Sequence, residues 1–190
     1  MTEQELLQDC LRRLNGADVT YMLTGSMASN AWGIPRTTHD LDFVLQLPPA
    51  EVPKLIDAFA HPDYFIDEPA VRAAYQPPHQ FNVIHVPSAL KADFWMLRPV
   101  PFEREMFGRR VKDVWFGETL WLATAEDVIL HKLYWNRLTP SDRQLSDVAG
   151  VVAVQSGRLD LPYLRHWAAE IAVADPLETA LSGRLKLKDT

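Results

Sequence analysis

The sequence contains a single cysteine, Cys10, so no disulfide can form within the chain, which fits a reducing compartment. It has no run of about 18 apolar residues, so a membrane-spanning helix is not expected. The acidic, amphipathic N-terminal segment lacks the basic start and apolar centre of a signal peptide. We therefore expect a cytoplasmic protein without a membrane partner.

An excess of positive charge is also missing. The formal net charge of the 190-residue chain is −6, with a pI near 5.5, which disfavours a generic DNA binder. The net charge is compatible with a local basic groove, because Arg104 lies close in sequence to the Arg-Arg-Val-Lys run at 109–112. The length and the apolar content of 47% suit one domain, or a core domain with a helical appendage.

Hydrophobic periodicity and capping signals predict a mixed succession of elements. Helices are expected at 2–16 (with Thr2 and Glu5 as a capping box), 26–32, 50–60, 124–138 (opened by Thr124 and Asp127), 141–156, 162–173 and 175–186. Strands are expected at 19–23, 40–47, 80–86 and 91–97, the last two as an antiparallel pair, with short strands near 109–116 and 118–123. Prolines between the helix at 50–60 and the strand at 80–86 favour loops.

These elements predict an α+β fold, in which strands dominate the middle of the chain and helices its end. We expect a small mixed β-sheet flanked by helices in residues 1–123, with a helical C-terminal region, 124–190, packed on that core.

Two aspartates lie two residues apart in the predicted strand 40–47. Strand periodicity places Asp40 and Asp42 on one face, where two carboxylates repel each other unless a cation lies between them. The pattern indicates a divalent-metal site, although a solvated strand edge or a turn cap would also explain it. Asp93, in the strand 91–97, shares its face with Lys91 and Trp95 and has either a third metal-site role or a structural one.

The pair Gly25-Ser26 opens a predicted short helix. A helix N-terminus offers unpaired N–H groups, glycine lets a phosphate come close, and serine adds a hydroxyl donor. The pair therefore indicates a phosphate-binding turn, with an ordinary N-cap turn as the alternative.

Two basic residues are candidates for contacts with phosphate. Lys132 lies among apolar neighbours on its predicted helix, so it needs a charged partner, either a triphosphate or a structural salt bridge, unless it snorkels to water. Arg36 precedes the aspartate pair and could bind phosphate, pair with an acidic side chain or lie in solvent. For Asp147, pairing with Arg143 four residues away on one helix is the simple expectation.

The segment GSMASNAWGIPRTTHDLDFVL combines these features in a fixed order. It resembles the signature of the nucleotidyltransferase superfamily typified by DNA polymerase β. It is most similar to the branch of minimal nucleotidyltransferases and abortive-infection or toxin–antitoxin proteins. The matching positions are Gly25, Ser26, Gly33, Arg36, Thr38, Asp40 and Asp42, and the later segment LATAEDVILHKLYWNR is also similar to that branch.

The resemblance implies specific roles for these residues. It implies that Asp40, Asp42 and Asp93 bind Mg²⁺ (or Mn²⁺) and carry catalysis, with Asp93 helping to activate the attacking hydroxyl. It implies that the nucleotide is bound by Gly25, Ser26, Arg36, Thr38 and Lys132. Asp113 is the nearest rival for the third carboxylate.

The resemblance implies an enzyme that moves a nucleoside monophosphate from a nucleoside triphosphate to an acceptor hydroxyl. The acceptor is an RNA end, a protein or a small molecule. A toxin–antitoxin component would modify tRNA or a partner protein and have a cognate antitoxin. The alternatives are a catalytically inactive member, serving as a binding or antitoxin module, and a metal-dependent phosphodiesterase.

Overall fold

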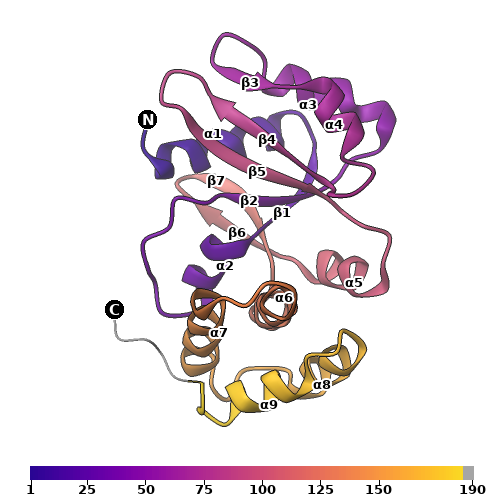
Figure 1. Ribbon diagram of the computed structural model, residues 1–190. Coiled ribbons are helices and arrows are strands. Elements are labelled where there is room, and N and C mark those ends of the chain that lie inside the picture. Colours follow the sequence, from indigo (N-terminus) through magenta and orange to yellow (C-terminus); the bar gives the residue numbers. More distant parts are fainter. Residues whose placement is uncertain (186–190) are drawn as a thin grey trace. The chain divides into compact units, whose positions relative to one another are not determined.

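The computed structural model describes residues 1–185 and divides them into two compact units (Figure 1). Unit 1 comprises Met1–Thr24 and His39–Leu122, and contains all the strands found in these residues. Unit 2 combines Gly25–Thr38 with the chain from Ala123 on, and is helical. A domain boundary between residues 123 and 124 remains a prediction.

A seven-stranded mixed sheet forms the centre of unit 1, in the order β3-β4-β5-β2-β1-β7-β6. The strands are β1 (Thr20–Thr24), β2 (Asp42–Gln46), β3 (Tyr64–Ile66), β4 (Gln80–His85), β5 (Leu90–Met96), β6 (Val111–Trp115) and β7 (Glu118–Leu122). Strand β2 is antiparallel to β1 and parallel to β5, while β4 and β5 form the expected antiparallel pair. The α+β prediction is confirmed.

One face of this sheet carries the aromatic core of unit 1. The rings of Phe43, Phe94 and Phe81 stack across three neighbouring strands, with centroids 5.2 Å and 5.5 Å apart. Phe59, which follows α3 (Val52–Ala58), packs edge-on against Phe94, and all four side chains are buried. Because side chains alternate along a strand, residues next to these phenylalanines, such as Asp42 and Asp93, lie on the opposite face of the sheet.

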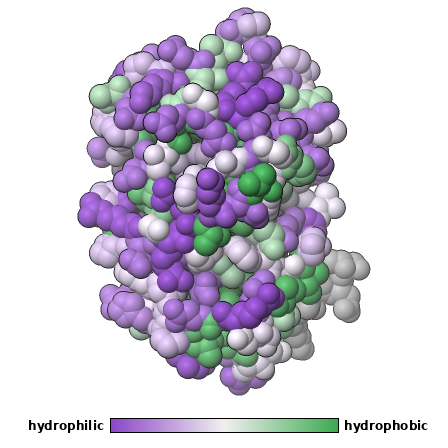
Figure 2. All heavy atoms as spheres, turned by 180° about the vertical axis from the view of Figure 1, so that it is seen from behind, coloured by the Kyte–Doolittle hydropathy of each residue, from purple (hydrophilic) through white to green (hydrophobic). Residues whose placement is uncertain are grey.

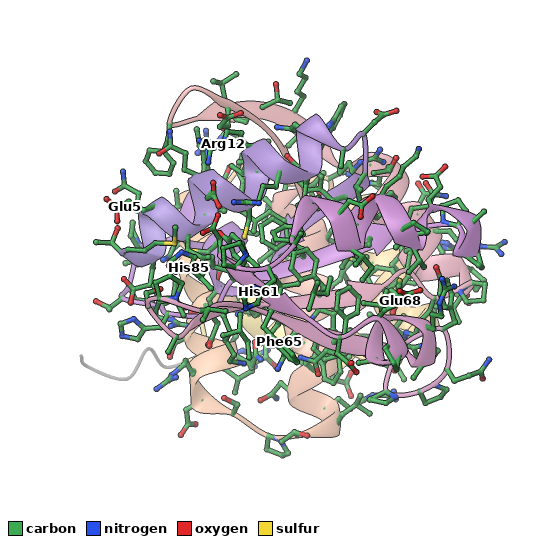
Figure 3. All side chains as sticks on the ribbon, turned by 90° about the horizontal axis from the view of Figure 1, so that it is seen from above. Glu5, Arg12, His61, Phe65, Glu68 and His85 are labelled. Atoms are coloured by element: carbon green, nitrogen blue, oxygen red, sulfur yellow. The ribbon has the colours of Figure 1, made fainter. Side chains whose placement is uncertain are left out.

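Helix α1 (Glu3–Gly16) begins with the predicted capping box of Thr2 and Glu5. Its buried carboxylate Asp9 accepts a hydrogen bond of 2.5 Å from the Tyr64 hydroxyl, which ties the helix to β3. Burial and this carboxylate raise the pKa of Tyr64, so the phenol remains a donor. Figure 3 looks onto this end of unit 1, with Arg12 marking α1, Phe65 marking β3 and Glu68 marking α4 (Glu68–Ala73).

Unit 2 consists of helices α2 (Gly25–Trp32), α6 (Ala125–Leu138), α7 (Asp142–Val154), α8 (Leu161–Glu170) and α9 (Ala174–Leu181). Thr124 caps α6 as expected, and its hydroxyl also donates to the carboxylate of buried Asp127. The Tyr163 hydroxyl donates to the other oxygen of Asp127 at 2.5 Å, which holds α8 at the start of α6. The Trp32 indole donates to the Ala123 carbonyl at 2.7 Å.

The structure corrects several of the predicted boundaries. Strand β2 begins at Asp42 rather than at residue 40, because its partner β1 ends at Thr24, opposite Asp42. The segments that form β3, α4 and α5 (Pro101–Arg109) were not predicted as regular elements. Helix α9 ends at Leu181, before the predicted end at 186, a position outside the described residues.

On the one face that Figure 2 draws, the exposed apolar side chains do not form one large surface. On the face drawn in Figure 2, hydrophobic residues lie in small groups between hydrophilic ones, an arrangement that is ordinary for a globular protein. No helix within residues 1–185 has the length and apolar character needed to cross a membrane.

Candidate active site

A polar row crosses four strands of the sheet in unit 1. Asp42 lies opposite Thr24 on antiparallel β1 and opposite Asp93 on parallel β5, and Asp93 lies opposite Asn82 on β4. Residues in register on adjacent strands point to the same face, with backbones roughly 4.8 Å apart. The structure therefore brings Asp42 and Asp93 together, although they are about fifty residues apart in the sequence.

The two carboxylates are half-buried and have identifiable partners. The Lys91 ammonium donates to both oxygens of Asp93 at 2.9 Å, and the Asp93 side chain is 13% exposed. When the Asn82 amide is oriented with its nitrogen toward Asp93, that nitrogen donates a hydrogen bond to Asp93 Oδ1 at 2.9 Å. The Trp95 indole lies 3.5 Å from Asp42 Oδ1, at the limit of a hydrogen bond.

Asp40 is placed differently from the prediction. It lies before β2 in an irregular, exposed segment, so strand alternation does not set the direction of its side chain. The preceding His39 is held by the Glu3 carboxylate, 2.6 Å from its Nδ1. This contact explains how the segment next to Asp40 is attached to the start of α1.

The donor chemistry at the Asp42–Asp93 pair fits a hard divalent cation. Carboxylate oxygens are the ligands that Mg²⁺ and Mn²⁺ prefer, and two side-by-side carboxylates are stabilised by a cation between them. In residues 1–185, no group of three His, Cys, Asp or Glu side chains is arranged to hold a metal ion.

A second charged cluster lies within unit 2, around the buried carboxylate of Asp147. Lys132 Nζ donates to Asp147 Oδ2 at 2.6 Å, and Arg36 donates from Nε to Oδ1 at 2.7 Å and from its terminal nitrogen to Oδ2 at 2.9 Å. The same guanidinium donates to the Ser26 hydroxyl at 2.8 Å. Two predicted nucleotide-binding residues, Arg36 and Lys132, are thus joined through Asp147, and the third, Ser26, is joined to them through Arg36.

The carboxylate of Asp147 is shared by two cations, Arg36 and Lys132. The Arg36 guanidinium also donates to the Ser26 hydroxyl, close to the start of α2, where the helix dipole favours an anion. Burial alone would raise the pKa of Asp147, but hydrogen bonds from Arg36 and the charge of Lys132 outweigh it, and the pKa is lowered. Asp147 therefore stays ionised.

Sequence reasoning missed Asp147, for which pairing with Arg143 on the same helix was expected. That prediction is wrong, because the carboxylate faces Arg36 and Lys132 instead. The available signal was Lys132 itself, a lysine on an apolar helix face that required an anionic partner. A further missed residue is Asn30, whose side-chain amide bonds both the N–H and the carbonyl of Arg36 and fixes that backbone against α2.

The remaining predicted residues occupy the turn and the loop on either side of α2. Gly25 has a φ of +63° at the junction between β1 and α2, a conformation that glycine adopts without a steric penalty. Thr38 is half-buried in the irregular segment after Arg36. Glycine at position 25 therefore has two explanations, the positive φ of the backbone and the predicted close approach of a phosphate.

Two glycines allow the loop after α2 to lie against α7. A Cβ on Gly33 would meet the backbone nitrogen of Val151 at 2.8 Å, and one on Gly150 would meet the backbone nitrogen of Ile34 at 3.2 Å. Gly33 precedes Arg36 by three residues, and Gly150 follows Asp147 by three. The close backbone contact thus positions Arg36 beside Asp147.

We expect Gly33→Ala to separate this loop from α7 and to lower the stability by about 1–3 kcal/mol, because backbone atoms cannot yield as a side chain can. Thermal unfolding would measure the change. Gly108→Ala is the matched control, since a Cβ there meets nothing within 4 Å, and it should be neutral or stabilising. A Gly33→Ala variant as stable as the control variant would contradict the positioning role.

Comparisons with known proteins identify the fold. The chain has a TM-score of 0.59 and 12% identity with the crystal structure of ANT(2″)-Ia in complex with adenylyl-2″-tobramycin, covering 98% of this chain and 100% of that one. The solution structure of the antibiotic-resistance factor ANT(2″)-Ia gives 0.58 and 10%, covering 92% and 96%. An antigenic nucleotidyltransferase-like protein from Paracoccidioides brasiliensis gives 0.58 and 13%, covering 95% and 92%.

The chain has a nucleotidyltransferase fold. No protein-family model and no curated protein matches its sequence. At 10–13% identity, these structural neighbours establish the fold alone. The roles of individual residues must therefore be argued from the two clusters described above.

Proposed function

We propose that the protein is a Mg²⁺-dependent nucleotidyltransferase that transfers a nucleoside monophosphate from a nucleoside triphosphate to an acceptor hydroxyl. The observation that carries the proposal is the pairing of Asp42 and Asp93 in register on adjacent parallel strands, with both side chains on one sheet face. This sheet belongs to a nucleotidyltransferase fold. The pair offers metal ligands on a rigid support, which is what precise positioning of phosphate groups requires.

The carboxylates of unit 1 would hold the metal and the acceptor. Asp42 and Asp93 are the proposed ligands, and Asp40 is a further candidate from the adjoining segment. When bound, Mg²⁺ would neutralise phosphate charge and polarise phosphate oxygens. Asp93 would also accept the proton of the acceptor hydroxyl, and Lys91, which donates to both its oxygens, would have to release one of them for this.

The basic cluster of unit 2 would bind the triphosphate. Ser26 and Arg36 offer hydroxyl and guanidinium donors, Gly25 lets a phosphate approach the backbone, and Thr38 is the remaining candidate in the loop. Lys132 is buried against Asp147, so it would act on the triphosphate through its positive charge rather than through a direct hydrogen bond. The cations Arg36 and Lys132 would stabilise the negative charge that develops on the leaving pyrophosphate.

The acceptor is proposed from three classes. An RNA end or a protein hydroxyl would fit a toxin–antitoxin component in the cytoplasm, with tRNA as one substrate and a cognate antitoxin as partner. A small molecule is the third class, since the ANT(2″)-Ia structure contains an adenylylated tobramycin.

A transfer assay tests the proposal. The protein is incubated with each α-labelled nucleoside triphosphate, Mg²⁺ and fractionated cell extract, and the labelled product is separated into RNA, protein and small molecules. We expect label in one fraction, and none with Asp42→Asn. A lack of transfer with every nucleotide and every fraction would reject the proposal that the protein is a nucleotidyltransferase.

A catalytically inactive binding or antitoxin module is the second candidate. It is favoured by the observation that the predicted ligands already have protein partners, Asp93 with Lys91, and Arg36 and Lys132 with Asp147. Calorimetry with MgATP and MgCTP separates the two candidates. An enzyme should bind one of them more weakly after Asp42→Ala, whereas binding that is absent or unaffected by the substitution favours the module.

A further inference from the structure

The cations of unit 1 are distributed unevenly between paired and unpaired positions. Six of them form ion pairs with nearby carboxylates, and these are Arg12, Arg13, Lys54, Arg72, Lys91 and Arg98. Arg104, Arg110 and Lys112 form no ion pair with any residue of the described chain. All three fall in the nine-residue segment 104–112, which we call the basic segment.

The basic segment runs from within α5 into the edge strand β6, two elements of unit 1 that follow each other directly (Figure 1). Helical and strand rises place the Cα atoms of Arg104 and Lys112 within roughly 20 Å of each other. Arg104 and Lys112 are exposed, and Arg109 adds a fourth cation. Glu105 lies within the segment, and Glu103 and Asp113 lie next to it, with Glu103 paired to Arg98, so the segment is positive in a chain whose net charge is −6.

The guanidinium of Arg110 is held in place by aromatic rings and has no anionic partner within residues 1–185. Its guanidinium lies over the rings of Phe107 and Trp121, 4.3 Å and 5.0 Å from their centroids, and one terminal nitrogen donates to the Phe107 carbonyl. Its Nε is buried and has no hydrogen-bond acceptor among residues 1–185. Burial lowers the pKa of this guanidinium, so part of the cost of desolvating it for a ligand has already been met in the folded protein.

Exposed apolar side chains continue the basic segment along β6. Val114 is 62% exposed, and Phe116, at the tip of the β6–β7 hairpin, is 45% exposed. Phe116 has a φ of +53° in a two-residue turn with Gly117, a position that normally carries Asn or Gly. The geometry of the turn does not explain an exposed aromatic residue at this position, so we attribute Phe116 to a role in binding.

One outward backbone N–H on the edge of β6 is already bonded to a side chain. The outward N–H of Val114 donates to Asp113 Oδ1 at 2.7 Å, and the same carboxylate accepts from the Trp115 indole at 2.9 Å. A peptide that paired with this edge would have to displace that bond. Unpaired cations followed by an exposed aromatic ring are instead the combination that binds single-stranded nucleic acid.

We propose that residues 104–116 form a binding surface for a single-stranded nucleic acid, with Arg104, Arg110 and Lys112 on its phosphates and Phe116 stacked on a base. The proposal rests on the proposed function in one respect, namely that the bound strand would carry the acceptor hydroxyl. Binding itself requires neither nucleotide nor metal, so the two proposals can fail separately.

Fluorescence anisotropy with a short labelled oligoribonucleotide tests the surface. The wild-type protein should bind it, and between roughly 50 and 200 mM salt the affinity should fall steadily. The double variant Arg104→Gln/Lys112→Gln should bind more weakly, with a slope of log affinity against log salt smaller by about 1.4, or 0.7 for each lost contact. Lys54→Gln/Arg72→Gln, which removes two paired cations, is the charge-matched control and should keep the wild-type slope.

Phe116→Asn tests the stacking contact without harming the fold, because asparagine tolerates the positive φ. We expect about tenfold weaker binding with unchanged or higher thermal stability. Asp42→Asn should bind like the wild type even if it abolishes transfer. The surface is refuted if the wild type does not bind, if the double variant and its control behave alike, or if polyglutamate competes as well as the oligoribonucleotide.

Discussion

Asp147→Ala should lower the free energy of unfolding by about 3–5 kcal/mol, because the substitution leaves the buried Lys132 ammonium without its anion. The Asp147 and Lys132 side chains are 4% and 8% exposed, so water replaces the lost contact poorly. For a protein of this size, the loss corresponds to a fall in the unfolding temperature on the order of 10 °C. Calorimetry or circular dichroism at neutral pH would measure it.

Two further variants separate the charge effect from a loss of packing. Glu170→Ala removes an exposed carboxylate from α8 and should change the stability little. Lys132→Met in the Asp147→Ala background removes the stranded ammonium and should recover part of the loss. If Asp147→Ala were as stable as Glu170→Ala, the buried cluster would not have the energetic role assigned to it.

Asp42→Asn and Asp93→Asn should each reduce the rate of nucleotidyl transfer by roughly 10²–10³-fold or more, since each removes a charge that holds the metal and stabilises the transition state. Both substitutions keep the side-chain shape and remove charge from an electrostatically crowded pair, so we expect the fold to be retained. Steady-state rates at saturating nucleotide and Mg²⁺ would measure the effect.

Asp113→Asn is the control for the assignment of the third carboxylate. Asp113 lies on the edge strand β6, three strands away from β2 in the sheet, where it bonds the Val114 N–H and the Trp115 indole. Its substitution should leave the transfer rate within a few-fold of the wild type. A large loss with Asp113→Asn and none with Asp93→Asn would exchange the roles of the two residues.

Local signals in the sequence predicted the elements that have strong caps and clear periodicity. The helix at α1 and the strand pair β4–β5 followed from such signals. The short strand β3 was missed, because three residues between proline-rich segments carry too little periodicity to be recognised. Helix α5 was also missed, and prolines at its start masked an apolar face that buries Phe102 and Met106.

The parts of the candidate site that are formed by residues close together in the sequence could be predicted from it. The pairing of Asp42 with Asp93 needed the parallel register of β2 and β5, which no local pattern specifies. The partner of Arg36 and Lys132 was inaccessible for the same reason, since Asp147 lies 111 residues from one and 15 from the other. The association of residues 25–38 with the C-terminal helices likewise depends on long-range contacts such as that between Gly33 and Val151.

A Mn²⁺ titration in the presence of a non-hydrolysable nucleoside triphosphate, followed by electron paramagnetic resonance, tests the metal-binding role of the Asp42–Asp93 pair most directly. Mn²⁺ shares the oxygen-ligand preference of Mg²⁺ and can be observed by this method. We expect saturable binding by the wild type, and binding weakened at least tenfold in both Asp42→Asn and Asp93→Asn. Equal Mn²⁺ affinity in the wild type and the two variants would show that these carboxylates do not hold the metal.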